Sequence, residues 1–102
     1  MQAIFLVLAK KESLMRQKIN QEVSIVAFYN SRKQIAEPYV ISWNNCDYTV
    51  GEIGYHHKIY DGKICHHIYE LVNSEQNLWF RLNLNTDNLH WTLEEVSDGN
   101  AD

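Results

Sequence analysis

The sequence predicts a mainly β (α+β) fold, namely a six-stranded antiparallel meander that curls into a small barrel or half-barrel, preceded by an N-terminal helix. Three observations predict it. From residue 22 onward, apolar residues recur with a period of two. The resulting runs are rich in Val, Ile and aromatic residues and are separated by turn-forming residues. With 102 residues, four Gly and one Pro, the chain is typical of one folded domain.

The first predicted element is a helix-like extension over residues 1–21. In AIFLVLAKKESLMRQKI, which begins at residue 3, the apolar positions 4, 8, 15 and 19 have helical spacing. Residues 3–9 are equally compatible with a short buried strand. This apolar run is shorter than the about 20 residues that span a membrane, and it lacks the flanks of a signal peptide. Nothing indicates secretion, so we expect reduced cysteines, a cytoplasmic location and no membrane contact.

The predicted β domain covers residues 22–97, and residues 98–102 are expected to form a disordered tail because they contain no apolar anchor. Alternation changes phase between Val50 and Ile53, which indicates a bulge at Gly51. The six expected strands are residues 22–29, 38–43, 47–53, 63–72, 78–84 and 89–96.

Two hairpin registers follow from the turns. If Asn44-Asn45 forms a two-residue turn, Trp43 faces Cys46, and all residues on that face are apolar or aromatic, so Cys46 is expected to be buried. The further pairs of this hairpin are Ile41 with Tyr48 and Tyr39 with Val50. A four-residue turn at 85–88 likewise pairs Leu84 with Leu89, Leu82 with Trp91 and Phe80 with Leu93.

Four of the five histidines lie in YHHKIYDGKICHHIY, residues 55–69. Asp61-Gly62 is a typical type I′ turn, which would place Tyr60 opposite Lys63. Alternation then separates the histidines into two opposed pairs, one on each face of the ribbon. The predicted pairs are His57 with His66, and His56 with His67, the latter on the face that also carries Lys58 opposite Cys65. Protonating both members of a close pair is unfavourable, so mild acid is expected to loosen this hairpin.

His56, Cys65 and His67 form a possible metal set, because opposed side chains are close enough to share a zinc ion. The set needs a fourth ligand, no Cys-x-x-Cys or His-x-x-x-His spacing accompanies it, and Lys58 would repel a cation. Half-buried structural histidines are the alternative. Cys65 with a histidine base is also conceivable as a nucleophile, but no Gly-rich oxyanion loop is visible. We therefore expect no enzymatic activity and no cofactor.

Trp79 and Arg81 lie on the polar face of the predicted strand 78–84. An exposed aromatic residue on a sheet indicates a protein-partner surface, so both residues are candidates for partner binding. Packing of Trp79 beneath the N-terminal helix remains the alternative.

The formal net charge of −4 is unevenly distributed. Residues 1–37 contain six Lys/Arg and three Asp/Glu, a net of +3, whereas residues 38–102 contain three and ten, a net of −7. An acidic body matches the nucleic-acid backbone poorly, so direct nucleic-acid binding is not expected.

Four motifs stand out, namely Pro38-x-x-Ile41-x-Trp43, Tyr48-x-Val50-x-x-Ile53, Tyr69-Glu70-Leu71 and Trp91-x-Leu93-x-x-Val96-x-Asp98. Over roughly residues 22–98 they resemble a family of short bacterial β-domains of unknown function. Some members are encoded near, or fused to, translesion-polymerase-like proteins, so the resemblance implies at most an accessory role in nucleic-acid transactions and no catalytic residues. The chain departs from the family at Asn44-Asn45, where a basic residue and Gly are usual, and in its additional N-terminal segment.

These observations together predict a small soluble domain that acts as a non-enzymatic interaction or accessory module. The alternative is a small-ligand or metal-binding protein that uses the hairpin at 55–69.

Overall fold

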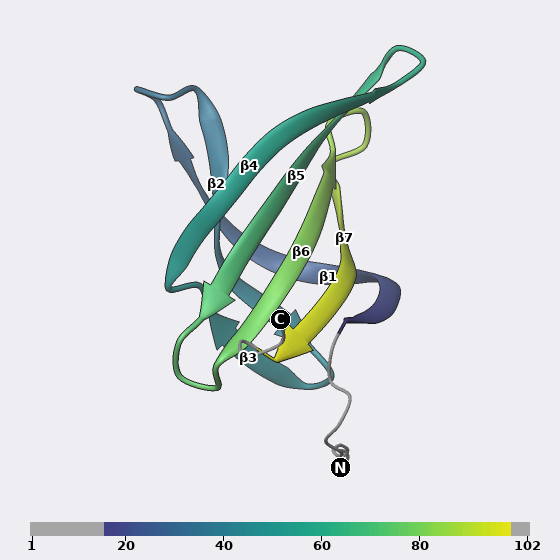
Figure 1. Ribbon diagram of the computed structural model, residues 1–102. Coiled ribbons are helices and arrows are strands. Elements are labelled where there is room, and N and C mark those ends of the chain that lie inside the picture. The colour runs from purple at the N-terminus through teal and green to yellow at the C-terminus, as the bar shows by residue number, and fades with distance from the viewer. Residues whose placement is uncertain (1–15, 99–102) are drawn as a thin grey trace.

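The computed structural model describes residues 16–98, which form one antiparallel sheet curled into a half-barrel (Figure 1). The order of strands across the sheet is β3-β2-β1-β7-β6-β5-β4, so β3 and β4 are its two edges. The strands are β1 (Gln17–Asn30), β2 (Ile35–Trp43), β3 (Cys46–Thr49), β4 (Glu52–Asp61), β5 (Ile64–Asn73), β6 (Leu78–Asn85) and β7 (His90–Asp98).

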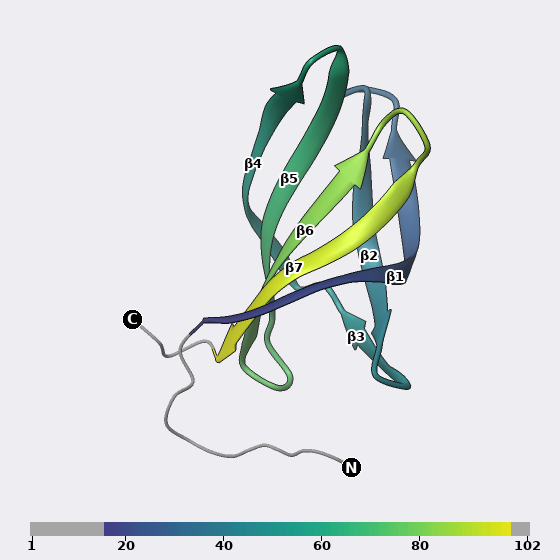
Figure 2. The same ribbon diagram turned by 90° about the vertical axis from the view of Figure 1, so that its right-hand side faces the viewer.

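The two edges of the sheet meet at Val50 and Gly51, where the chain passes from one to the other. The Val50 amide donates to the carbonyl of Tyr39 in β2 at 2.9 Å, and the Gly51 amide donates to the carbonyl of Val72 in β5 at 2.8 Å. A Cβ atom on Gly51 would lie 3.3 Å from that carbonyl oxygen, so glycine permits the close approach. Beyond this junction β2 and β4 diverge, and the barrel stays open (Figure 2).

This junction corrects the predicted strand count. The expected strand at residues 47–53 is divided into β3 and the start of β4, which gives seven strands instead of six. The phase change in the sequence therefore marks the crossing between two sheet edges. A separate register shift lies between Ile53 and Tyr55, where β4 pairs with β5.

The core fills the concave side of the sheet. Alternate residues of β5, β6 and β7 point inward, as the period of two predicts. Phe80 makes edge-on contacts with Trp43 at 6.5 Å and with Tyr48 at 5.4 Å between ring centroids. The contact with Tyr48 packs β3 against the core. The buried cluster consists of Ile41, Tyr69, Leu71, Phe80, Leu82, Leu84, Leu93 and Val96.

The predicted N-terminal helix is wrong for the part that the structure describes. Residues 1–15 lie outside the described residues, but Gln17–Asn30 is a strand. Its first half pairs with β7 and its second half with β2, so the tertiary pairing overrides the helical spacing of the sequence. The pairing with β7 is interrupted between Lys18 and Gln21, where Asn20 adopts a φ of 49°.

The register predicted at Asn44-Asn45 is confirmed. Trp43 pairs with Cys46, and both asparagines have the positive φ, 57° and 62°, that a type I′ turn requires. The predicted burial of Cys46 is wrong, since it is exposed at the end of the hairpin. Tyr39 is also exposed, because the register of β2 against β1 shifts beside it and directs Pro38 inward instead.

The predicted β4–β5 register is wrong by two residues, which leaves the paired side chains on their expected faces. The predicted β6–β7 register is wrong by two residues near the turn and by three beyond a register shift between Arg81 and Leu82, where Phe80 pairs with Val96 instead of Leu93. In the β4–β5 hairpin, Asp61 pairs with Ile64 around a turn formed by Gly62 and Lys63. Only Gly62 has positive φ, at 63°, as in a type II′ turn. A type I′ turn at Asp61-Gly62 would have required positive φ at Asp61 as well.

In the β6–β7 hairpin, Asn85 is the last paired residue rather than the first residue of the turn. It pairs with His90, so Leu84 faces Trp91 and Leu82 faces Leu93. The Asn85 side-chain oxygen accepts a bond from the Asp87 amide at 2.8 Å, which stabilises the turn. The asparagine side chain therefore sets where this turn begins.

Candidate functional site

The outer edge of β4 is one of the two free edges of the sheet formed by the described residues. The two-residue turn makes Asp61 and Ile64 a hydrogen-bonded pair, so the main-chain groups of alternate residues, Ile59 and His57, bond to β5. The Thr86 amide donates a hydrogen bond to the Cys65 carbonyl at 3.1 Å, so the main-chain groups of Cys65 point away from β4. The main-chain groups of every second residue of β5 therefore bond to β6, and those of the residues between them bond to β4.

Three residues of β4 therefore direct their main-chain N–H and C=O groups away from the sheet. They are His56, Lys58 and Tyr60. No strand within residues 16–98 pairs with this side of β4. The site is thus a free hydrogen-bonding edge on a strand of ten residues.

Beneath this edge, on the concave side, His56 and His67 contact each other. The Nε2 atom of His56 and the Nδ1 atom of His67 are 2.7 Å apart, and the ring planes are inclined by only 5°. The two residues are diagonal neighbours rather than directly opposed as predicted, because the register differs by two: His56 faces Tyr69, and His67 faces Lys58. The contact requires a proton on only one of the two nitrogens.

The surroundings of this histidine pair favour its uncharged form. Burial lowers the pKa of His56, and the charges of His67, His57 and Lys58 lower it further. Burial and the charge of Lys58 likewise lower the pKa of His67. Both imidazoles are therefore mainly uncharged at pH 7.

Tyr69 forms the floor below the pair. It is 1% exposed, and its ring stacks on His56 at 4.8 Å and lies 5.5 Å from that of Trp91. Its hydroxyl donates a hydrogen bond to the Ala36 carbonyl of β2. Burial, together with the charge of Glu37, raises the pKa of Tyr69 to about 12. Tyr69 thus connects β5 to β2 through the interior and closes the half-barrel beneath the open edge.

The predicted metal set is only partly assembled. His56 and His67 are together, but Cys65 pairs with Tyr60, whose pKa is raised by its hydrogen bond to that thiol. Two nitrogen ligands of a tetrahedral zinc ion lie about 3.3 Å apart, farther than the 2.7 Å of this hydrogen bond. Within residues 16–98, no three His, Cys, Asp or Glu side chains are arranged to hold a metal ion. Zinc binding stays a prediction that requires these side chains to move.

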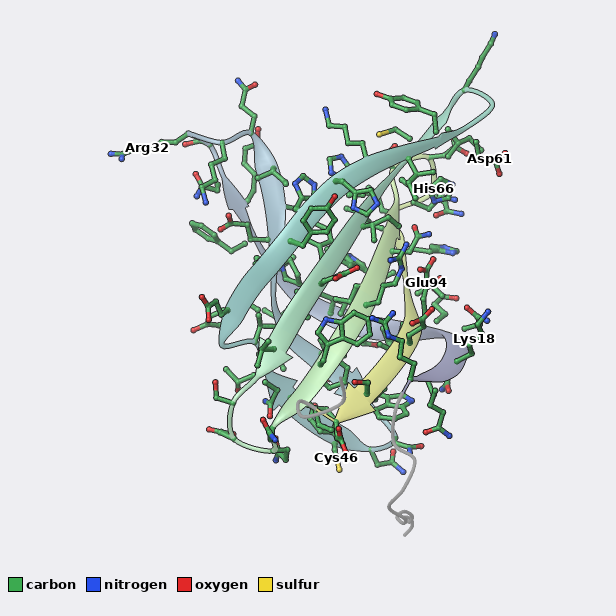
Figure 3. All side chains as sticks on the ribbon, in the orientation of Figure 1. Lys18, Arg32, Cys46, Asp61, His66 and Glu94 are labelled. Carbon is green, nitrogen blue, oxygen red and sulfur yellow. The ribbon has the colours of Figure 1, made fainter. Side chains whose placement is uncertain are left out.

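The other two histidines of the β4–β5 hairpin, His57 and His66, lie on the convex face. His66 Nδ1 lies 2.9 Å from the Asn83 side-chain oxygen, and the Asn83 amide nitrogen donates to Glu94 at 2.8 Å. Because the Asn83 oxygen must then accept, His66 carries its proton on Nδ1. Figure 3 shows His66 and Glu94 on the same side of the molecule. The buried Nδ1 of His57 has no hydrogen-bond partner among the described residues, and its ring contacts Tyr55 at 4.9 Å.

The predicted partner-binding residues share the convex face of β6, and both already have intramolecular contacts. The Arg16 guanidinium lies 4.5 Å above the centre of the Trp79 ring. Arg81 donates to Glu94 at 2.8 Å and to Glu70 at 3.1 Å. Their role in partner binding stays a prediction, since each would first have to give up these contacts.

Sequence reasoning missed several exposed aromatic residues. Near the open edge these are Phe28, Tyr39, Tyr55 and Tyr60. Alternation alone did not identify them, because a bulge turns Tyr39 outward and because β4 lacks a second neighbour. The unpaired position of β4 becomes visible only from the order of the strands.

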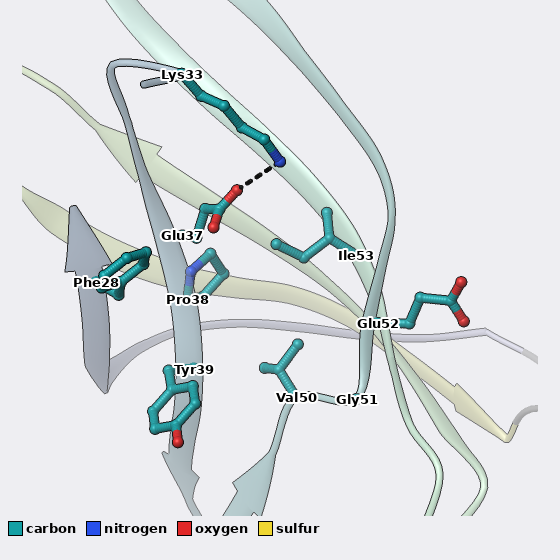
Figure 4. Close-up of a pocket in the computed structure, with 9 residues that line it drawn as sticks. All are labelled: Phe28, Lys33, Glu37, Pro38, Tyr39, Val50, Gly51, Glu52 and Ile53. Carbon is teal, nitrogen blue, oxygen red and sulfur yellow. Dashed lines mark hydrogen bonds and ion pairs between the residues drawn. The ribbon is translucent and has the colours of Figure 1, made fainter. Parts of the chain in front are cut away.

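A groove of about 680 Å³ lies where β2 and β4 begin to diverge (Figure 4). The Lys33 ammonium and the Glu37 carboxylate form an ion pair of 3.2 Å at one end of it. Apolar side chains supply much of its wall. The lining residues are Phe28, Lys33, Glu37, Pro38, Tyr39, Val50, Gly51, Glu52 and Ile53.

No family model, curated protein or solved structure matches this chain. The resemblance to short bacterial β-domains therefore stays a prediction. Residues 16–98 include no helix with the length and apolar character needed to cross a membrane.

Proposed function

We propose that the protein is a non-enzymatic binding module that takes up an extended segment of a partner protein along the outer edge of β4. The observation that supports this most directly is the row of outward main-chain groups at His56, Lys58 and Tyr60. An extended peptide can add to such an edge as a further strand, because its own amides and carbonyls complete the unpaired groups. The adjacent groove then offers a place for a side chain of that peptide.

The character of β4 also favours this mode of binding. Natural edge strands are usually protected by shortness, by proline, by several charges, by bulges or by a covering element. β4 is ten residues long, contains no proline and has Lys58 as the one charged residue of its central part. Its register shift, between Ile53 and Tyr55, lies near the start of the strand and before the outward groups at His56, Lys58 and Tyr60. Tyr55, Ile59 and Tyr60 are 54%, 41% and 65% exposed and provide apolar surface on both faces of the strand.

The arrangement of Cys65 supports the non-enzymatic half of the proposal. A cysteine nucleophile requires a base within hydrogen-bonding distance. Cys65 is paired directly with Tyr60, while the two nearby imidazoles, His56 and His67, bond to each other. Neither histidine is therefore positioned to activate the thiol.

Binding of a small molecule is the second candidate, and the groove is the observation that favours it. Its volume falls within the range of about 300–1,000 Å³ that is typical of ligand pockets. The ligand would contact apolar side chains such as Pro38 and Ile53, with Glu37 and Lys33 as polar partners.

A library of random twelve-residue peptides, displayed and selected against the full chain, tests the proposal. Selected peptides are then measured against Tyr60→Pro and Tyr60→Ala. Both variants remove the ring and its bond to Cys65, but only proline removes an outward N–H, and it removes none that bonds to β5. Binding should be retained by Tyr60→Ala and weakened about tenfold or more by Tyr60→Pro, since main-chain bonds provide the affinity in strand addition.

Circular dichroism and thermal unfolding establish that both variants are folded. The proposal would be overturned if the selected peptides bound both variants with equal affinity. It would also be overturned if peptide binding changed the chemical shifts of protein amides away from β4. Shifts confined to the groove, with no effect of either substitution, would favour the second candidate.

A further inference from the structure

Three basic side chains gather on the concave side of the free edge. Lys58 of β4 lies directly opposite His67 of β5, and His67 is hydrogen-bonded to His56. The Lys58 charge acts on both imidazoles, which places the three groups in one electrostatic cluster. Lys58 and His56 therefore border the position that a strand added to β4 would occupy, while His67 lies one strand further in, on β5.

No acidic side chain compensates this cluster. Within residues 16–98, no Asp or Glu oxygen lies within 4.0 Å of Lys58, His56 or His67. On β4 itself, Glu52 and Asp61 are at the two ends of the strand. Because both imidazoles are mainly uncharged at pH 7, Lys58 supplies the uncompensated positive charge beside the unpaired edge, and this charge is complementary to a carboxylate supplied by a ligand.

The remaining groups that face the histidine pair are neutral or already paired. From β5 these are Cys65 and Tyr69, and burial raises the pKa of the Tyr69 hydroxyl to about 12, so it stays protonated at neutral pH. From β2, Glu37 is bonded to Lys33 at 3.2 Å. The pair can therefore respond to a new negative charge without competition from a resident one.

We propose that the segment bound along β4 carries a Glu or Asp side chain on its concave side, which binds beside Lys58 and the His56–His67 pair, and that this binding takes up a proton. The inference rests on strand addition at β4 and names the chemistry of the segment. Side chains of neighbouring strands have Cβ atoms about 4.5–5.5 Å apart, so a carboxylate on the added strand reaches Lys58 and His56 directly.

Proton uptake follows from the hydrogen bond between the two imidazoles. In the free protein, burial and Lys58 hold the pKa of both histidines below the ordinary value. A carboxylate on the ligand raises it again, because an opposite charge favours the imidazolium form. One proton can be added without loss of the His56–His67 bond, since imidazolium on one side can donate to neutral imidazole on the other.

The rest of the site fixes the pattern of the segment. On the convex side, Tyr55 and Ile59 present apolar surface to the intervening side chains. At the groove end, Glu37 and Glu52 disfavour a further carboxylate, whereas Val50 and Ile53 favour an apolar residue. The occupant is therefore an extended peptide in which acidic and apolar residues alternate.

A second copy of this chain is a poorer occupant than such a peptide. Antiparallel pairing of two β4 edges through their outward groups brings Lys58 of one copy beside His56 or Lys58 of the other, which opposes like charges. Self-association is an outcome that the experiment detects.

The probe is the capped peptide Thr-Val-Glu-Val-Glu-Val-Thr, and the matched control is the same peptide with Gln in place of Glu. Fluorescence anisotropy with the full chain should show about tenfold tighter binding of the Glu peptide. Its affinity should increase further, by a few-fold, as the pH falls from about 7.5 to about 6. Lys58→Gln should abolish most of the preference, whereas Lys18→Gln, at an exposed position of β1, should leave it unchanged.

The outcomes separate this inference from the proposed function. Equal affinity of the Glu and Gln peptides, with chemical-shift changes at His56, Lys58 and Tyr60, would overturn the inference and leave strand addition intact. Absence of binding by both peptides, together with failure of the library selection, would overturn both. Concentration-dependent dimerisation that protects β4 and excludes the Glu peptide would likewise contradict the acidic occupant.

Discussion

β4 and β5 carry the same His-His doublet within one hairpin, yet the two strands differ sharply in burial. β5 has neighbours on both sides, and its Ile68 and Tyr69 are each 1% exposed, on opposite faces of the sheet. β4 has one neighbour, and none of its ten residues is buried. Position in the sheet, rather than composition, therefore decides which strand stabilises the fold and which remains available for binding.

The comparison also separates two kinds of histidine. On the convex face, His66 is part of a satisfied polar network with Asn83 and Glu94. On the concave face, His56 and His67 satisfy each other beside an open edge, with no acidic partner among the described residues. The first arrangement is structural, and the second is able to respond to pH and to a charged ligand.

The largest expected effect is a difference in the loss of unfolding free energy between a core variant and an edge variant. Leu82 on β6 is 0% exposed, so Leu82→Ala should cost about 2–5 kcal/mol of unfolding free energy through lost burial and a cavity. Ile59→Ala, on the half-exposed edge, should cost about 1 kcal/mol or less. Urea unfolding measures both, and similar losses would show that β4 is as well packed as the centre of the sheet.

A smaller effect on stability is expected for Tyr69, whose side chain connects β5 to β2 through the interior. Tyr69→Phe keeps the ring but removes the donor to the Ala36 carbonyl, and it should cost about 1–3 kcal/mol because a partly buried acceptor loses its partner. Tyr39→Phe is the matched control at an exposed position and should be close to neutral. If thermal unfolding finds no difference between the variants, Tyr69 does not hold the half-barrel closed.

The smallest expected effect is a pH dependence of stability. The folded-state pKa values of His56 and His67 are lowered below the unfolded value of 6.5, so the unfolded chain binds more protons in mild acid. Their contribution is fully present above pH 6.5 and is lost as the pH falls through that value toward the lower folded pKa values. Denaturant titrations should show a flatter profile for His56→Gln/His67→Gln than for the wild type.

His90→Gln is the control for that experiment, because His90 is an exposed histidine on β7, outside the His56–His67 pair. It should leave the fall in stability below pH 6.5 unchanged. A double variant with the same pH profile as the wild type would show that the His56–His67 pair does not control the acid response.

Much of the fold follows from the period of two. It correctly places His56 and His67 on one face and His57 and His66 on the other, because a register error of two residues preserves the face. It does not locate the turns, since the choice between Asp61-Gly62 and Gly62-Lys63 depends on which residue adopts positive φ. The strand at 17–21 could not be predicted either, because its pairing with β7 depends on residues more than seventy positions away.

The candidate site was predictable only in part. The face shared by His56, Cys65 and His67 follows from alternation, whereas the bond between the two histidines depends on the final register. That β4 is an edge follows from the crossing at Val50–Gly51, which the phase change in the sequence marks but does not distinguish from a bulge. The exposed aromatics of β4 gain meaning only once that edge is known.

Amide hydrogen exchange along β4 tests the central claim most directly. The amides of Tyr55, His57 and Ile59 bond to β5, whereas those of His56, Lys58 and Tyr60 point outward. In the free protein, exchange should alternate along the strand, with the outward amides faster by about a hundredfold or more. Equal protection of all six amides, or slower exchange at His56, Lys58 and Tyr60, would contradict the free edge and the binding mode built on it.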